Sequence, residues 1–335
     1  MKAKMAAIVS RQSCELTSDL TAKVRRYADA SLRQTTWLAY RRFFSRFTAW
    51  CELHERASLP ASAETVTLFL ADIADRYRPE TLSGILTVIG HAHRAAGHPF
   101  DRAGFHPIMQ GIRRTYGSPN KRRTAITIDH LRELVSGLPD SLMGARDRVI
   151  LTLGFAAALR PSELTGLDIG RAGPRSLGSV EIEQEWLRIT LRHSQSGQRP
   201  IIKAIPRGGS PCPLEALERW LALAGISSGP ILLWMRKNGP TRYRLHCQSV
   251  SRVVQRAVYA QGVKGGMDAE SAWARARLFG GHSLRAGFVT SAVLAGASSE
   301  SIARHVGWKS ITMVGYYRRK DGLFHKHPVQ RVFAS

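Results

Sequence analysis

The chain is poor in cysteine and has no long apolar run. Its four cysteines lie far apart and form no C-x-x-C pair: Cys14, Cys51, Cys212 and Cys247. This spacing argues against a zinc site or a disulfide framework and predicts reduced thiols in a cytoplasmic protein. No stretch reaches the roughly 18 apolar residues of a membrane span. Charged residues interrupt the short apolar run near the N-terminus, so we expect no secretory signal there.

Acidic residues are scarce relative to basic ones. The chain has 49 Lys and Arg against 25 Asp and Glu, which gives a net charge of +24 and a pI near 10.9. Residues 121–335 carry most of this excess, with 32 basic and 15 acidic residues. Such an imbalance is typical of proteins that bind polyanions. A hydrophobic content of 44% argues against a ribosomal or chromatin protein, since those chains are commonly Lys-rich and short of core residues.

The first part of the chain is predicted to be a small all-helical module over residues 20–116. Its first long helix, within residues 31–55, places five residues on one face, and they suit a core: Trp37, Tyr40, Phe44, Phe47 and Cys51. Arg41 and Arg42 lie largely on other faces, where they suit contact with a DNA backbone. Three further helices, over 63–77, 80–96 and 106–116, are separated by proline and glycine breaks.

A basic linker is predicted over residues 117–125. Gly117 and Pro119 precede three consecutive cations, Lys121, Arg122 and Arg123. Turn formers followed by cations favour a flexible strap that crosses phosphates. A solvated linker with no partner is the alternative.

The second domain, residues 126–335, is predicted to be helical with a small inserted sheet. An apolar stretch over 146–160 predicts a buried helix with Arg160 at its C-terminal end. Residues 179–206 alternate in polarity and contain a turn at 194–198, which predicts a β-hairpin. From Pro213 the helical pattern is expected to continue to the end. The fold class is therefore mainly α, in two domains.

Five separated polar residues in this domain suit phosphodiester chemistry. They are Arg160 in ALRPSEL, His282 and Arg285 in GHSLRAG, Trp308 in HVGWKS and Tyr317 in VGYYRRK. An arginine keeps its proton and presents a planar fork that fits phosphate oxygens. A phenol can attack phosphorus and hold it covalently. We expect His282 and Arg285 to share a helical face, since they are three residues apart.

In their order and spacing these residues resemble the tyrosine recombinases, also called phage integrases. The resemblance lies in Arg160 with Glu163 in an R-x-x-E-L context, the H-x-x-R pair, and an aromatic residue nine positions before the tyrosine. Trp308 stands where histidine is commoner in the family. The N-terminal module likewise resembles the family's core-binding domain, and the second domain its catalytic domain.

The resemblance implies a role for each residue. Arg160 and Arg285 hold the scissile phosphate, with Glu163 as support. His282 moves a proton, Trp308 donates its indole N–H, and Tyr317 forms a 3′-phosphotyrosyl bond without any metal or cofactor. Composition alone leaves the adjacent Tyr316 open as nucleophile, and the interval from Trp308 selects Tyr317.

One departure from the family pattern lies in the predicted hairpin turn. The family usually has a lysine there, as general acid for the leaving 5′-oxygen, but this chain has Gln195. Glutamine has no ammonium proton to give. Lys203 on the returning strand is the nearest substitute, although it also fits an ordinary strand position.

The sequence thus predicts a DNA recombinase that acts on specific sites. The resemblance implies double-stranded DNA as partner, a homotetramer on two duplexes, and a nucleoid-associated protein of bacterial or phage origin. Two alternatives remain. One is a relaxing enzyme of the type IB topoisomerase kind, and the other, motivated by Gln195, is a DNA-binding protein with little or no cleavage activity.

Overall fold

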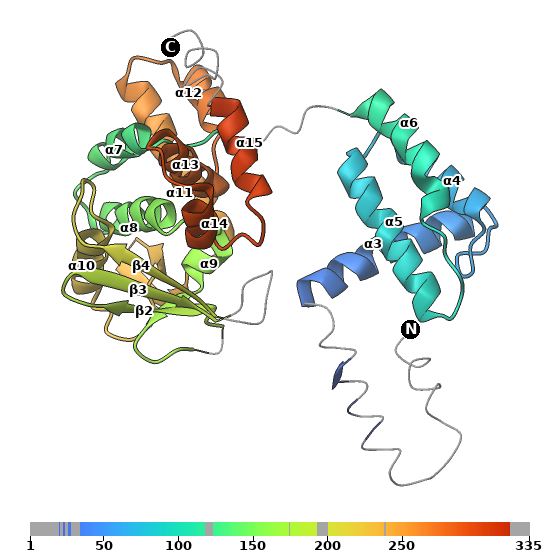
Figure 1. The fold of residues 1–335 in the computed structure, drawn as a ribbon, viewed down its shortest axis with the longest axis horizontal. Coiled ribbons are helices and arrows are strands. Elements are labelled where there is room, and N and C mark those ends of the chain that lie inside the picture. The colour runs from blue at the N-terminus through green and yellow to red at the C-terminus, as the bar shows by residue number, and fades with distance from the viewer. Residues whose placement is uncertain are drawn as a thin grey trace, which may run out of the picture. The chain divides into compact units, whose positions relative to one another are not determined.

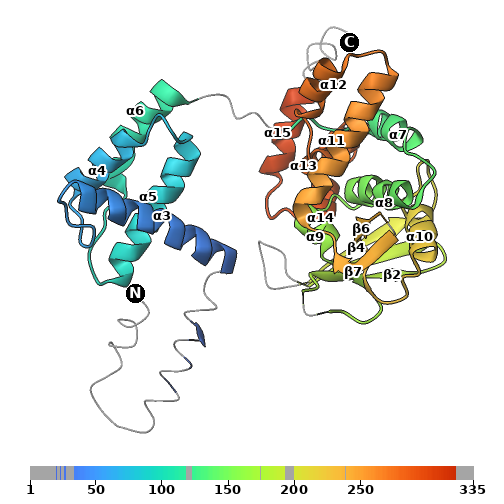
Figure 2. The same ribbon diagram turned by 180° about the vertical axis from the view of Figure 1, so that it is seen from behind.

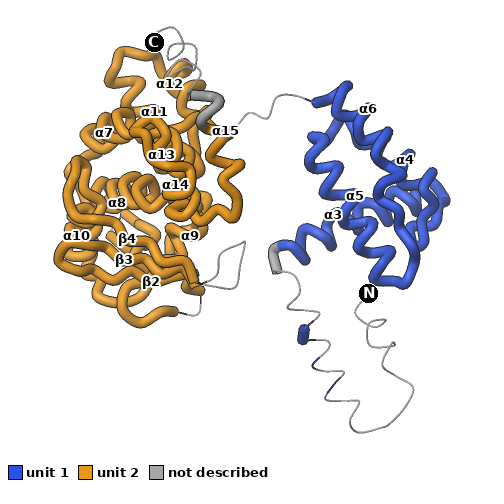
Figure 3. The backbone as a smooth tube through the Cα atoms, viewed as in Figure 1, with its two compact units in different colours: residues 1–121 blue, residues 122–335 orange. Residues whose placement is uncertain are grey.

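The computed structural model describes residues 20, 23, 26, 27, 34–117, 123–173, 175–192, 200–237 and 239–321. Side chains at 34, 35, 316 and 318–321 are outside this description. The chain divides into two compact units, residues 1–121 and 122–335 (Figure 3). Among the described residues, no helix is both long and apolar enough to cross a membrane.

The first unit is a helical domain with its own core. Its elements are α3 (Gln34–Leu53), α4 (Ala63–Asp72), α5 (Pro79–Ala95), the short 3-10 helix η1 (Ala103–Phe105) and α6 (His106–Tyr116). Phe47 and Cys51 on α3 are fully buried and pack with α4 and α5, as the aromatic stripe predicts. Arg41 and Arg42 are exposed on α3. The second helix is shorter than expected, because α4 ends at Asp72 and turns replace its predicted last residues.

The second unit combines helices with a five-stranded sheet (Figure 1). Its helices are α7 (Ile128–Ser136), α8 (Leu142–Ala156), α9 (Pro161–Thr165), α10 (Pro213–Ala224), α11 (Cys247–Lys264), α12 (Ala269–Ala276), α13 (His282–Leu294), α14 (Ser299–Val306) and α15 (Thr312–Asp321). The sheet has the order β4-β3-β2-β1-β5. Its strands are β1 (Leu167–Ile169), β2 (Gly178–Ile182), β3 (Trp186–Leu191), β4 (Ile201–Pro206) and β5 (Gly229–Pro230).

The predicted hairpin is present as the antiparallel pair β3 and β4. Its connection, residues 193–199, lies outside the described residues. One hydrophobic core joins this sheet to α8 and α10, and Trp220 of α10 is fully buried in it. The mainly helical, two-domain fold class is thus confirmed.

The prediction of uninterrupted helix after Pro213 is wrong. A separate hairpin, β6 (Leu233–Arg236) and β7 (Gly239–Arg244), precedes α11 (Figure 2). Gly239, at φ +122°, forms the start of the returning strand, a conformation that side-chain-bearing residues avoid. The short apolar run before it consists of the buried Ile231 and Leu232 and the first residues of the half-buried strand β6. Periodicity does not distinguish such a short run from a helix.

Candidate active site

Arg160 lies at the start of a helix. The apolar helix α8 ends at Ala156, and Arg160 is the N-cap residue of α9, not the end of α8 as expected. Its Nη1 donates to Glu163 Oε1 over 2.6 Å, and its backbone N–H donates to Glu163 Oε2 over 2.8 Å. Glu163 is 7% exposed. Glu163 thus holds both the guanidinium and the backbone N–H of Arg160.

Helix α13 presents the predicted pair at its N-terminal end. His282 is its first residue and is exposed, whereas Arg285, one turn later, is buried. At Gly281, the residue just before this helix, a protein neighbour explains the small residue. A Cβ there would come within 2.6 Å of Pro161 Cγ. Gly281 therefore lets α13 start directly against α9, and this brings His282 and Arg285 to Arg160.

Arg285 is the centre of the cluster. Its Nη1 donates to the carbonyl of Ala158 over 2.6 Å, while its buried Nη2 has no hydrogen-bond partner. Burial, followed by repulsion from Arg160, lowers the pKa of Arg285 to about 10, and Glu163 and Tyr317 oppose that shift. Arg285 therefore remains cationic at neutral pH. A buried donor without a partner is costly unless a ligand completes it, and a phosphate oxygen would do so.

Trp308 and Tyr317 close the cluster from the C-terminal side. The guanidinium carbon of Arg285 lies 5.6 Å from the centre of the Trp308 ring. Trp308 in turn stacks on Tyr317, with ring centres 5.9 Å apart and planes at 22°. Gly307, at φ +79°, ends α14 and directs the chain so that Trp308 follows at once. Tyr317 lies on α15; the side chain of Tyr316 is outside the described residues.

Lys203 is buried within this cluster, although its spacing fits an ordinary strand residue. It lies on β4, is 3% exposed, and donates a hydrogen bond from Nζ to the carbonyl of His305. Burial is the main cause that lowers its pKa to about 7, and Arg285 adds to the shift. Glu163 partly opposes it, and Arg160 lowers the pKa further. An ammonium with this pKa can lose a proton near neutral pH.

His282 is biased towards its neutral form. Desolvation by the surrounding protein is the largest cause that lowers its pKa, and the charges of Arg285 and Arg160 lower it further. The charge of Glu163 partly opposes this shift. Although its side chain reaches solvent, the two guanidinium groups make a second positive charge unfavourable. A neutral imidazole can accept a proton from a nearby phenol.

The structure therefore brings together all the predicted catalytic residues of the second unit that it describes. Gln195, Lys121 and Arg122 lie outside the described residues. Arg123 is described, and its Nη1 donates to the carbonyl of Arg277 in the same unit. Arg41 and Arg42 belong to the first unit.

Sequence reasoning missed His305. It lies on α14, its Nε2 is 2.8 Å from the carbonyl oxygen of Ala156, and its ring stacks on Phe288 with centres 4.6 Å apart. Its carbonyl is the acceptor for Lys203. A histidine three residues before a tryptophan carries no signal of its own, so only the tertiary contacts reveal it.

The basic β6–β7 hairpin was also missed, although a sequence signal existed. No acidic residue occurs between Glu218 and Asp268. On the hairpin, the guanidinium carbon of Arg236 lies 5.2 Å from the centre of the Trp234 ring, and that of Arg242 lies 5.4 Å from the Tyr243 ring. Both aromatic residues are exposed. Exposed Arg–aromatic pairs without acidic neighbours in sequence form a surface that suits a nucleic-acid backbone.

That hairpin is tied to the helix behind Arg160. Arg244 of β7 donates to the carbonyl of Thr165 over 2.8 Å and pairs with the fully buried Asp168 over 2.5 Å. Thr165 is the last residue of α9. The hairpin is thus held in a fixed position relative to Arg160.

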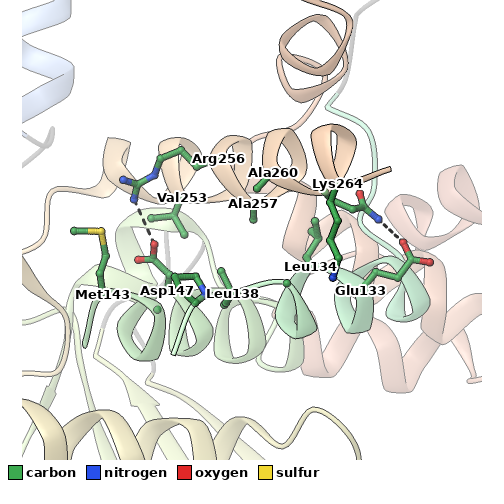
Figure 4. Close-up of a pocket in the computed structure, with 14 residues that line it drawn as sticks. Glu133, Leu134, Leu138, Met143, Asp147, Val253, Arg256, Ala257, Ala260 and Lys264 are labelled. Atoms are coloured by element: carbon green, nitrogen blue, oxygen red, sulfur yellow. Dashed lines mark hydrogen bonds and ion pairs between the residues drawn. The ribbon is translucent and has the colours of Figure 1, made fainter. Parts of the chain in front are cut away.

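A groove between α7, α8 and α11 lies apart from this chemistry (Figure 4). It encloses about 260 Å³ and has an apolar floor with Leu134 and Ala257. On its rim, Asp147 pairs with Arg256 over 3.3 Å. None of the predicted catalytic residues lines it. Among the described residues, no three His, Cys, Asp or Glu side chains gather in a way that could hold a metal ion.

Known proteins are similar to this chain in sequence. An integrase/recombinase xerD homolog of Selenomonas ruminantium is 28% identical over 97% of this chain and 93% of its own length. Recombinase cre of Escherichia phage P1 is 23% identical over 85% of this chain and 83% of its own.

Solved structures agree at the level of the fold. The integrase of transposon Tn1549, in complex with transposon right-end DNA, has a TM-score of 0.57 at 14% identity, covering 88% of this chain and 92% of its own. A lambda integrase dimer bound to a core site has a TM-score of 0.53 at 18% identity, covering 96% and 85%. Residues 125–322 match the model of the phage integrase family, and the chain therefore belongs to that family, the tyrosine recombinases.

Proposed function

We propose that this tyrosine recombinase cleaves and rejoins DNA at specific sites, with Tyr317 as nucleophile and Lys203 as leaving-group acid. The observation that carries the proposal is the position of Arg285. It contacts the Ala158 carbonyl beside Arg160 and lies over the ring of Trp308, which stacks on Tyr317. A phosphate at the unpartnered Nη2 of Arg285 would thus meet two guanidinium groups, an indole and a phenol.

The proposed cleavage step uses only groups of the protein and of the DNA. The phenol oxygen of Tyr317 attacks the scissile phosphorus, and its proton passes to neutral His282. The bond from phosphorus to the 5′-oxygen breaks, so the 3′-phosphate becomes bound to tyrosine. Arg160 and Arg285 stabilise the charge that develops on the non-bridging oxygens. Because the phosphotyrosine conserves the phosphodiester, a 5′-hydroxyl from another strand can displace it in the reverse reaction.

Lys203 supplies the proton to the departing 5′-oxygen in this proposal. Burial beside Arg285 and a pKa of about 7 make its ammonium a better acid than an exposed lysine. Gln195 has no such proton, so we assign the general acid to strand β4 and not to the turn that precedes it. This assignment also removes the reason to propose a non-cleaving DNA-binding protein.

Double-stranded DNA is the proposed partner. The excess of basic residues supports it, as does the basic surface of the β6–β7 hairpin. Exchange between two duplexes requires four cleavages, so we propose a homotetramer assembled on DNA. We also propose that the protein is of bacterial or phage origin and associates with the bacterial nucleoid. Arg41 and Arg42, exposed on the first unit, and the basic segment 121–123 are the proposed contacts to DNA outside the active site.

A nicked substrate tests the proposal. If the nick lies just beyond the cleavage point, a short fragment diffuses away after cleavage and leaves the protein covalently bound to DNA. Inverted repeats beside the gene provide candidate sites for such substrates. We expect a covalent band on a denaturing gel at a specific position. Binding without that band would contradict cleavage, and relaxation of any supercoiled plasmid without site preference would favour a topoisomerase.

A further inference from the structure

Lys203 does two things at once in the folded protein. Its side chain is inside the active-site cluster, and its ammonium also caps the C-terminal end of α14 through the His305 carbonyl. The last carbonyls of a helix have no partner within the helix, and they carry partial negative charge. A lysine is a natural partner for such a carbonyl. An ammonium has three N–H groups, so one bond to His305 leaves others for DNA.

The His305 carbonyl can hold Lys203 both before and after proton transfer. The ammonium donates one N–H to this carbonyl and can give another proton to the leaving oxygen. The resulting amine still has two N–H groups, so its bond to His305 persists while its lone pair faces the new hydroxyl. A fixed carbonyl would therefore keep the nitrogen atom aimed during the whole step.

The imidazole of His305 fixes that carbonyl. Its Nε2 lies 2.8 Å from the carbonyl oxygen of Ala156, at the end of α8, and its ring stacks on Phe288 of α13. Helix α14 is thereby connected to α8 just before the segment that carries Ala158 and Arg160. Because Nε2 faces a carbonyl, it must carry the hydrogen and act as the donor.

The charges around the pair keep His305 neutral. Burial is the largest cause that lowers the pKa of His305, and the charge of Lys203 lowers it further. The hydrogen bond to Ala156 partly opposes this shift, and Arg285 adds a smaller decrease. A proton on His305 would repel the proton on Lys203. A neutral ring therefore preserves the acid form of its neighbour.

We infer that His305 is a positioning residue for the leaving-group acid: its carbonyl holds the Lys203 nitrogen, and its anchored imidazole keeps that carbonyl in place. The inference rests on the proposed role of Lys203. It assigns to α14 a function in protonating the 5′-oxygen, in addition to delivering Trp308.

The test compares two substrates in single-turnover cleavage. One is the normal oxygen substrate, and the other has a 5′-bridging sulfur, which leaves without a proton. We expect His305→Leu to slow oxygen cleavage by about tenfold or more, which is a fraction of the roughly 100-fold or larger effect of a general acid. Sulfur cleavage should slow by less than about twofold. His305→Gln should restore most oxygen cleavage, because its amide N–H can still donate to Ala156.

Ile302→Val is the matched control for a loosened α14. Ile302 is 2% exposed on the same helix, and this change creates a small packing defect in the apolar cluster that Ile302 shares with Val306. It should leave the ratio of sulfur to oxygen cleavage unchanged. If His305→Leu slows both substrates equally, or if Ile302→Val changes the ratio as much, His305 supports only the fold and the inference is wrong.

A double variant separates this inference from the proposed function. If His305 acts through Lys203, then Lys203→Ala with His305→Leu should have the same cleavage ratio as Lys203→Ala alone. A further increase in the ratio would show that His305 acts independently and would overturn the inference. If Lys203→Ala alone slows both substrates equally, the role of Lys203 as acid is wrong, and the inference about His305 fails with it for that separate reason.

Discussion

Arg285 donates a 2.6 Å hydrogen bond to the carbonyl of Ala158, a fully buried residue held at φ +47°. This left-handed conformation costs a residue with a Cβ about 1–2 kcal/mol. The strained peptide places its carbonyl where Arg285 can use it, two residues before Arg160. Arg160 and Arg285 are thus joined through backbone that is itself under strain.

Substitutions at Ala158 should therefore separate strain from packing. Ala158→Gly relieves about 1–2 kcal/mol of strain. It also loses about 0.8 kcal/mol of methyl burial and gains unfolded-state entropy, so we expect stability within about 1 kcal/mol of wild type. Cleavage should persist, because the carbonyl remains. Denaturant unfolding and covalent trapping measure the two effects.

Ala158→Val should be far more harmful. A β-branched residue at positive φ, in a fully buried site, should cost about 3 kcal/mol or more and slow cleavage by moving the carbonyl away from Arg285. A valine variant as stable and active as wild type would show that the conformation is not strained.

Tyr317→Phe should abolish the covalent product and retain specific DNA binding. It removes one oxygen and leaves the ring stacked on Trp308, so the fold should change little. Tyr316→Phe is the control and should still form the adduct. Trapping on the nicked substrate measures both variants, and loss of adduct in Tyr316→Phe alone would assign the nucleophile to Tyr316.

Lys203→Ala should slow the oxygen substrate by about 100-fold or more, the usual scale of a general acid, and spare the sulfur substrate. Gln195→Lys in the Lys203→Ala background tests whether an ammonium in the turn can replace it, and partial recovery of oxygen cleavage is expected. If Lys203→Ala slows cleavage of both substrates equally, another group provides the proton.

The acid assignment also predicts a pH dependence. The pKa of Lys203 is about 7 in the free protein, so the fraction of ammonium falls as pH rises through that value. A bound phosphate favours the charged form and should move the midpoint upward. Between about pH 6 and pH 9.5, the ratio of sulfur to oxygen cleavage should therefore rise with pH, and it should stay flat in Lys203→Ala. A constant ratio in wild type would contradict the assignment.

Replacing Lys121, Arg122 and Arg123 together by Ala should weaken DNA binding and its salt dependence. Each phosphate contact contributes about 0.9 to the slope of log affinity against log salt, so three contacts would lower its magnitude by up to about 2.7. Binding measured across a salt series gives the slope. An unchanged slope would mean that this segment does not contact phosphates.

The sequence by itself determined the elements with strong periodic patterns and predicted which residues make up the candidate active site. The aromatic stripe of α3, the hairpin of β3 and β4, and the ordered Arg160, His282, Arg285, Trp308 and Tyr317 could all be read from it. These signals are local or depend only on order along the chain. The short strands β6 and β7 were missed, because a brief apolar run fits a helix and a strand equally well.

Only the tertiary structure decided how the site is completed. Lys203 has the spacing of an ordinary strand residue, and what distinguishes it is burial against Arg285 and a bond to a carbonyl from a helix about 100 positions later. His305 likewise matters only through its contacts with Ala156 and Phe288. The acidity of a lysine depends on its surrounding charges and solvent, and these are set by residues that only folding brings together.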